Sequence, residues 1–119
     1  MEAREKMLQI VRHLDSKKAR DIKALGVSDL TILADYFVIC SAPSSTQVKS
    51  LADTLEEKMD SLGVPITKME GKQGFNWLLL DYSDVIVHIF YQETREFYGL
   101  EKLWQDAEVI SLDDILEED

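Results

Sequence analysis

The segment from Trp77 to Trp104 constrains the fold of this 119-residue chain more than any other part of the sequence. Two apolar runs of strand length, 77–80 and 85–91, flank the polar tetrad 81–84, whose Asp and Ser side chains can hydrogen-bond their own backbone. Continuous apolar runs bounded by turn residues are typical of strands covered on both faces. The segment therefore predicts a buried β-hairpin. A helical period over about 92–105 follows, with Phe97, Leu100 and Trp104 predicted to face the strands and Gly99 predicted to bend the helix or to permit close packing.

The chain before this hairpin alternates helical and strand patterns. Apolar residues recur at helical spacing over 2–18, and again over 44–62, where Ser44 provides a capping signal and Gly63 a stop signal. Strand patterns fall at 21–27, 36–41 and 66–70. The order α-β-β-α-β-β-β-α predicts an α/β (α+β) domain, a mixed β-sheet of about five strands with flanking helices. A helix joins the second and third strands, which predicts that they are parallel through a right-handed crossover.

The length suits one domain and is too short for two. We expect residues 1–110 to form that domain and residues 111–119 to form an acidic tail, because the chain from Asp106 onward carries seven acids and no bases. Three apolar residues of the tail could dock a turn, namely Leu112, Ile115 and Leu116, but the composition favours fraying.

Several features predict a cytoplasmic location. No apolar run reaches the roughly 18 residues that a membrane helix needs, and the sequence starts without an apolar signal region. The single cysteine, Cys40, has no partner for an internal disulfide, which is typical of proteins in a reducing compartment.

The formal net charge is −10 and unevenly distributed. Residues 1–26 hold seven Lys or Arg and four Asp or Glu, whereas residues 27–119 hold six and nineteen, so +3 and −13 sum to −10. An acidic body disfavours direct binding of nucleic acid, which requires clustered Lys and Arg. It suits a basic protein partner, although an acidic surface also serves simply to keep a small protein in solution.

The residues that carry chemistry in other proteins are sparse here. Asp81 and Asp84 lie three apart across the hairpin loop, and the turn accounts for them without a metal. His88 interrupts an apolar strand, and a single histidine there is usually a structural residue bonded to an acid or a carbonyl. His13 and Cys40 are too distant in sequence to share a ligand pattern with His88. We predict no catalytic residue, no metal and no cofactor.

One resemblance covers residues 5 to 108. The motifs WLLLDYSDVIVHIF at 77–90 and ETREFYGLEKLW at 93–104, preceded by DYFVICS at 35–41 and EG at 70–71, resemble the signature of the Iojap family, the ribosomal silencing factors. The resemblance implies a nucleotidyltransferase-like fold and a homodimer in the free state. It also implies binding to the large ribosomal subunit through its fourteenth protein, which blocks joining with the small subunit and represses translation under nutrient limitation.

A fold of that kind raises the alternative of a divergent nucleotide-binding or nucleotidyl-transferring enzyme. Active nucleotidyltransferases hold two metals with strand carboxylates and bind the triphosphate at a Gly-Ser turn. The corresponding turn here, 41–44, has no glycine, and no Asp-x-Asp pair follows it. Phosphoryl transfer depends on positioned metals and cationic clamps, so we predict a protein that is not an enzyme. A dimeric adaptor without a ribosomal role is a third alternative.

Two surfaces are candidates for the partner contact, because Trp, Tyr and Arg are frequent in binding hot spots. The first carries Trp77, Leu79 and Tyr82, with Glu70 and Asp81 steering association, and packing at the rim of the core is the alternative for Trp77 and Tyr82. The second is the helix with Arg95, Tyr98 and Glu101, where Arg95 and Glu101 are either solvated charges or members of an ion pair or a partner contact. Trp77 and Leu79 are two apart and share one strand face, so Leu78 and Leu80 are predicted to point into a helix-covered core.

Overall fold

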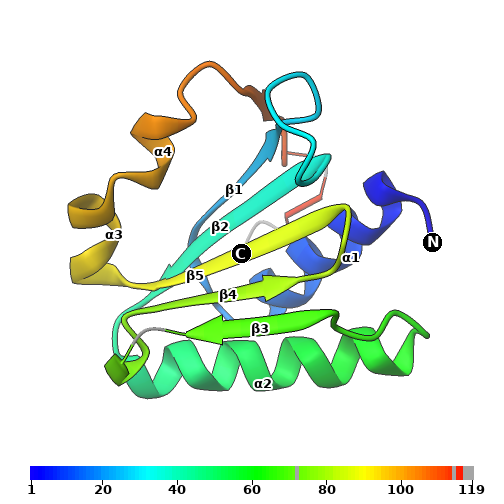
Figure 1. Ribbon diagram of the computed structural model, residues 1–119. Helices are drawn as coiled ribbons and strands as arrows, with labels where there is room; N and C mark the ends of the chain where they lie inside the picture. Colours follow the sequence, from blue (N-terminus) through cyan, green and yellow to red (C-terminus); the bar gives the residue numbers. More distant parts are fainter. Residues whose placement is uncertain (72, 114, 117–119) are drawn as a thin grey trace.

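The computed structural model of the chain describes residues 1–71, 73–113 and 115–116 (Figure 1). Its elements, in chain order, are α1 (Ala3–Ser16), β1 (Arg20–Gly26), β2 (Tyr36–Ala42), α2 (Ser45–Ser61), β3 (Lys68–Gly71), the 3-10 turn η1 (Gln73–Phe75), β4 (Trp77–Asp81), β5 (Val85–Tyr91), α3 (Gln92–Tyr98), α4 (Leu100–Leu103) and β6 (Glu108–Ile110). Within these residues the strands form a six-stranded mixed sheet in the order β3-β4-β5-β2-β1-β6. The predicted α/β class is confirmed, and β6 is a sixth strand that the sequence pattern did not reveal.

The second and third strands are parallel, as predicted, but they are not neighbours in the sheet. Strand β2 pairs in parallel with β5, with Ile39 opposite His88, while β3 pairs antiparallel with β4 at the edge of the sheet. Because β4 and β5 are antiparallel, β2 and β3 do run in the same direction, but two strands lie between them. The physical reason is burial: β5 is apolar on both faces and takes the centre, whereas every residue of β3 is exposed.

Helix α2 begins and ends where its signals predicted. The Ser44 hydroxyl accepts a hydrogen bond from the backbone N–H of Gln47 at 3.2 Å, which caps the first turn. At the other end Gly63 has φ 78°, and the N–H of Val64 donates to the carbonyl of Met59 at 2.9 Å.

The helix predicted over 92–105 is interrupted. Gly99 adopts a left-handed conformation with φ 61° and ψ 31°, so α3 ends before it and the short helix α4 begins after it. The break separates the two helices, and Phe97 consequently points outward, 83% exposed, rather than onto the strands.

The sheet has two different faces. Helices α1 and α2 cover one face and bury a large hydrophobic cluster there, which includes Met7, Leu55, Leu80 and Ile89. Helices α3 and α4 lie against the other face, over a smaller cluster around Phe37, Ile39 and Phe90. Figure 1 shows α3 and α4 on the side of the sheet opposite α1.

The end of the chain is not a free tail as far as it is described. Strand β6 pairs with β1, with Ile110 opposite Ala24, and Leu112, Ile115 and Leu116 pack against the helix-covered cluster. The prediction that these three residues fray is therefore wrong. Residues 114 and 117–119 of the predicted acidic tail lie outside the described residues.

Candidate partner-binding surface

The alternation of side chains along β4 creates the first candidate surface. Leu78 and Leu80 are buried in the helix-covered cluster, whereas Trp77 and Leu79 are half-buried on the opposite face. This confirms the predicted face assignment, and it follows from the two-residue period of a strand. Both side chains remain partly accessible on that face, although Tyr98 of α3 packs against the Trp77 ring.

Aromatic neighbours and a hydrogen bond to His88 hold Trp77 in place. Its indole Nε1–H donates to Nδ1 of His88 at 3.2 Å, and its ring stacks on Phe90 with centroids 5.0 Å apart and planes 27° apart. Tyr98 of α3 packs on the outer side, with centroids 4.9 Å apart. A tryptophan ordered in this way loses little side-chain entropy when a partner binds.

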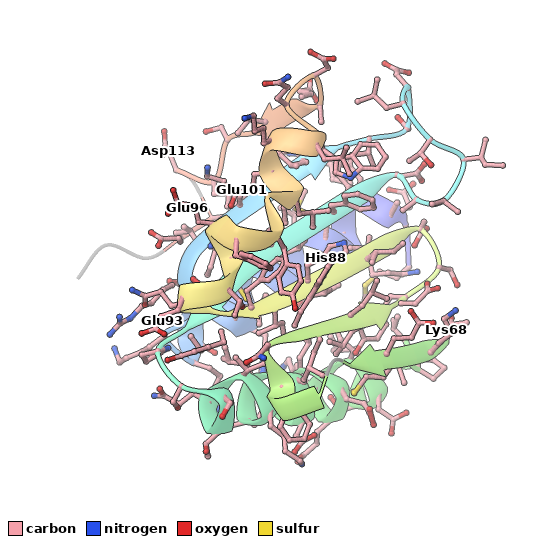
Figure 2. The ribbon with its side chains drawn as sticks, turned by 60° about the vertical axis from the view of Figure 1, so that its left-hand side comes forward. Lys68, His88, Glu93, Glu96, Glu101 and Asp113 are labelled. Atoms are coloured by element: carbon pink, nitrogen blue, oxygen red, sulfur yellow. The ribbon has the colours of Figure 1, made fainter. Side chains whose placement is uncertain are left out.

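His88 is the structural residue that the sequence predicted, but it bonds Trp77 rather than an acid or a carbonyl. It is 4% exposed and packs edge-on against Phe37. Because Nδ1 accepts the indole hydrogen, the neutral ring carries its own proton on Nε2, which has no hydrogen-bond partner within the described residues. Burial lowers the pKa of His88 to about 4, so the ring is neutral at physiological pH. Figure 2 shows His88 in the middle of the sheet, with Lys68 at its edge.

A hollow of about 340 Å³ lies beside Trp77 and Leu79, and Glu70 and Gly71 of β3 complete its lining. Of the two residues predicted to steer association, Glu70 borders this hollow and Asp81 does not line it. Glu70 borders the hollow and is exposed, ion-paired with Lys68 at 3.0 Å. Asp81 lies at the end of β4, and its Oδ1 accepts the backbone N–H of Ser83 at 2.8 Å, the turn role that the tetrad predicted.

The structure does not place Tyr82 on this surface. Its side chain is 1% exposed and belongs to the helix-covered cluster, because it continues the inward alternation of Leu78 and Leu80. Burial raises the pKa of the Tyr82 phenol, and the carboxylates of Glu56 and Asp60 on α2 raise it further. Tyr82 thus supports the fold beneath the surface, and a position at a hairpin tip misled the prediction.

The second candidate surface is built around an ion pair. Arg95 Nε donates to Glu101 Oε1 at 2.6 Å across the Gly99 break, and Lys23 of β1 donates to the other carboxylate oxygen at 2.7 Å. Arg95 Nη1 also lies 3.3 Å from the hydroxyl of buried Ser41. Partial burial opposes ionisation of Glu101, but the hydrogen bonds from Arg95 and Lys23 outweigh it and lower the carboxyl pKa. The pair fastens α3 and α4 to the sheet, beside a hollow of about 430 Å³.

Sequence reasoning missed two accessible apolar residues on these helices. Phe97 and Leu103 are 83% and 75% exposed. The signal that could have found them is Gly99, because a left-handed residue there interrupts the helical period on which their assignment depended. In Figure 2, Glu93, Glu96 and Glu101 lie around the same helices.

Comparison with known proteins gives the family. The model of the family described as ribosomal silencing factor during starvation matches residues 1–119. This chain belongs to the ribosomal silencing factor family. The ribosomal silencing factor of Bacillus subtilis is 42% identical over 99 residues, covering 83% of this chain and 84% of that protein. The mouse protein named mitochondrial assembly of ribosomal large subunit protein 1 is 36% identical over 98 residues, 80% of this chain and 43% of that protein.

Solved structures of similar proteins share the fold of this silencing-factor chain. A crystal structure from Chromobacterium violaceum has a TM-score of 0.84 at 34% identity and covers 88% of each chain. One from Bacillus halodurans has a TM-score of 0.78 at 35% identity, covering 91% of this chain and 99% of that one. The Bacillus subtilis relative is named as a silencing factor rather than as an enzyme.

The silencing-factor fold offers little for metal chemistry in the parts described. No group of three or more His, Cys, Asp or Glu side chains within residues 1–71, 73–113 and 115–116 converges as a metal site. Asp84, one of the two hairpin carboxylates, is paired with Lys6 of α1 at 2.6 Å. This ion pair fastens α1 to the hairpin loop between β4 and β5. Nor is any helix in these ranges long and apolar enough to cross a membrane.

Proposed function

We propose that this protein represses translation by binding the large ribosomal subunit through its fourteenth protein, where it blocks joining with the small subunit under nutrient limitation. Family membership supports the ribosomal role. The observation that carries the choice of surface is the ordered, half-exposed Trp77 beside Leu79 and an open hollow. Steric blocking requires only a rigid body and a specific contact, and an interface of about 800 Å² per partner is sufficient for that.

The charge of the molecule fits a basic ribosomal protein. With a formal net charge of −10, the body attracts a cationic partner over distance and accelerates association. The apolar anchors Trp77 and Leu79 then provide the short-range contact, and neighbouring Tyr98 extends it. Under this proposal Glu70 and Asp81 contribute to steering, and the Arg95–Glu101 pair holds the helices that flank the surface.

The proposal includes a cytoplasmic location, where bacterial ribosomes work, and a homodimer in the free state. It involves no enzymatic step, no direct contact with nucleic acid and no membrane. Because Tyr82 is buried, it takes part only by supporting β4 from below.

Gradient sedimentation is the direct test. The purified protein is mixed with separated bacterial large and small subunits, and we expect it to migrate with the large subunit alone. Adding the small subunit at a magnesium concentration that normally supports joining should then leave the two subunits separate. Migration with the small subunit, or with neither, would contradict the proposal.

The non-enzymatic part of the proposal has its own test. Calorimetry with magnesium and nucleoside triphosphates should give no binding, because Asp81 accepts a hydrogen bond within the turn and Asp84 is ion-paired with Lys6. The variant Asp81→Asn/Asp84→Asn should change stability only. Micromolar nucleotide binding that this variant abolishes would instead support the divergent nucleotidyl-transferring enzyme.

A further inference from the structure

Strand β3 forms one edge of the sheet and is the less protected of its two edges. It pairs with β4 on one side, and all four of its residues are exposed. The opposite edge, β6, has three residues. Natural proteins often guard an edge with a lysine, but Lys68 of β3 is tied to Glu70 of the same strand at 3.0 Å. The edge therefore presents open backbone groups.

The register identifies those groups. The N–H of Tyr91 donates to the carbonyl of Asn76, and the N–H of Tyr82 donates to that of Val85, so even-numbered residues of β4 bond to β5. Hydrogen-bonded and non-bonded pairs alternate in an antiparallel ladder. The odd-numbered residues of β4 consequently bond to β3 through Lys68 and Glu70, which lie opposite Asp81 and Leu79.

It follows that Met69 and Gly71 direct their backbone N–H and C=O groups away from the sheet. Met69 lies opposite Leu80 on the helix-covered side, and its side chain is 39% exposed. A further extended segment laid along β3 would find these two residues ready to pair, with no change in the existing ladder.

The two flanks of this edge differ in chemistry. On the side of α2, a hollow of about 290 Å³ is lined by Pro65 and Ile66, which lead into β3, and by four carboxylates of α2: Asp53, Glu56, Glu57 and Asp60. On the other side lies the hollow bounded by Trp77 and Leu79. Figure 1 shows α2 running beside β3. Successive residues of an added strand point to opposite sides, so one set would meet the carboxylates of α2 and the other would meet Trp77, Leu79 and the single carboxylate of Glu70 in the second hollow.

We propose that the partner protein contributes an extended segment with alternating basic and apolar residues, which adds to the sheet as a strand along β3. The proposal rests on the proposed function, since it describes how the ribosomal protein is held. Main-chain bonds to Met69 and Gly71 supply affinity. Basic side chains lie on the acidic face of α2, and apolar side chains enter the hollow beside Leu79. The charge pattern favours this partner over a second copy of the acidic chain.

A proline substitution tests the strand addition. Met69→Pro removes one outward N–H and places a ring at the edge, which an edge strand tolerates, whereas Met69→Ala keeps the N–H. We expect Met69→Pro to weaken binding to purified bacterial large subunits by about tenfold or more and Met69→Ala to stay within about threefold. Thermal unfolding of both variants checks that each is folded.

A charge variant tests the flank. Glu56→Gln/Asp60→Asn removes two carboxylates beside the edge, and Asp29→Asn/Asp106→Asn makes the same change in net charge elsewhere on the surface. We expect the first pair to weaken subunit binding several-fold more than the second. Equal effects would show that only overall charge matters and would overturn the assignment of basic residues to the α2 side.

Hydrogen exchange resolved to single amides provides a test without substitution. In the free protein the amides of Met69 and Gly71 should exchange fast and that of Glu70 slowly, and in the complex with large subunits all three should be slow.

Unchanged exchange at Met69 and Gly71 in a formed complex would overturn strand addition and leave the proposed function standing. Absence of any complex with the wild-type protein would instead contradict the proposed function. A Met69→Pro protein that loses self-association but binds subunits normally would assign the edge to a second copy and overturn the proposal.

Discussion

The two faces of the sheet carry similar apolar residues but differ in how completely helices cover them. The face under α1 and α2 is closed: Leu78, Leu80 and Val87 of the hairpin are buried there, together with Cys40, whose thiol pKa burial raises to about 12. The face under α3 and α4 is closed only in part, and it ends at half-exposed Trp77 and Leu79. One hairpin thus supplies the core with one set of side chains and the proposed binding surface with the alternate set, so a single residue step along β4 separates the two.

The largest expected effect compares neighbours on β4. Leu80→Ala should destabilise the protein by about 2 to 5 kcal/mol, because it leaves a cavity in a core where Leu80 has no exposed surface. Leu79→Ala should cost less than about 2 kcal/mol, since half-buried Leu79 already borders an open hollow. Urea unfolding of both variants measures the difference. Equal losses would show that the open face contributes as much to stability as the closed one.

The second prediction uses the only histidine that this hairpin carries. Because the pKa of His88 falls from 6.5 in the unfolded chain to about 4 in the fold, the unfolded chain binds a proton between these pH values that the folded chain does not. Stability contributed by neutral His88 is therefore complete above pH 6.5 and decreases as the pH falls toward 4, by about 3 kcal/mol in total. Over the same range the Cys40 thiol of the closed face stays protonated.

Unfolding of the wild type and of His88→Gln at pH 7, 5.5 and 4 checks this expectation. Glutamine can still accept the indole hydrogen of Trp77, so the variant removes the titration while keeping that contact. Burial also lowers the pKa of His13, and nearby Lys17 and Lys58 add to this. Since His13 is present in both proteins, its contribution cancels in the difference. Parallel stability profiles for the two proteins would contradict a titrating His88 on the open face.

The third prediction concerns recognition rather than folding. Trp77→Ala should weaken binding to large subunits by about 2 kcal/mol, as truncation of a hot-spot aromatic does. Val109→Ala is the control, because Val109 is an exposed apolar residue on β6 at the far edge of the sheet. Quantitative sedimentation with both variants measures binding. A folded Trp77→Ala protein that still blocks joining at the wild-type concentration would move the interface to the exposed residues of α3 and α4, Phe97 first.

These two faces could be predicted from the sequence only where the determining interactions are local. The alternation along β4 placed Leu78, Leu80 and Trp77 correctly, because a strand has a strict period of two. The same rule places Tyr82 inside, but its position beside a loop suggested exposure. The pairing of β2 with β5 depends on contacts between distant segments, which no local pattern encodes.

The remaining differences also have physical causes. Strand β6 is only three residues long and lies in an acidic context, so composition favoured a frayed end, whereas pairing with β1 orders it. The hydrogen bond between Trp77 and His88 links side chains eleven residues apart, whose approach follows from the hairpin register that places Leu79 opposite His88. The Arg95–Glu101 pair was an open alternative in the sequence, and the left-handed Gly99 brings the two side chains together.

The smallest expected effect concerns the segment after β6, which belongs to the closed face. Leu112, Ile115 and Leu116 are partly buried against the helix-covered cluster, and the N–H groups of Ile115 and Leu116 donate to the carbonyl of Leu112 at 3.0 and 2.9 Å. Removing residues 111–119 should therefore cost on the order of 1 kcal/mol, lowering the melting temperature by about 5 °C. The variant Leu112→Ser/Ile115→Ser/Leu116→Ser keeps the length and charge, and it should reproduce most of that loss if the apolar contacts are its cause. A melting temperature unchanged by the truncation would show that the segment is a frayed acidic tail, as its composition predicts, and that its contacts do not stabilise the fold. Subunit binding should not change in the serine variant, because it keeps the charge and the open face lies on the other side of the sheet, whereas the truncation also removes five acids that contribute to the attraction of a basic partner.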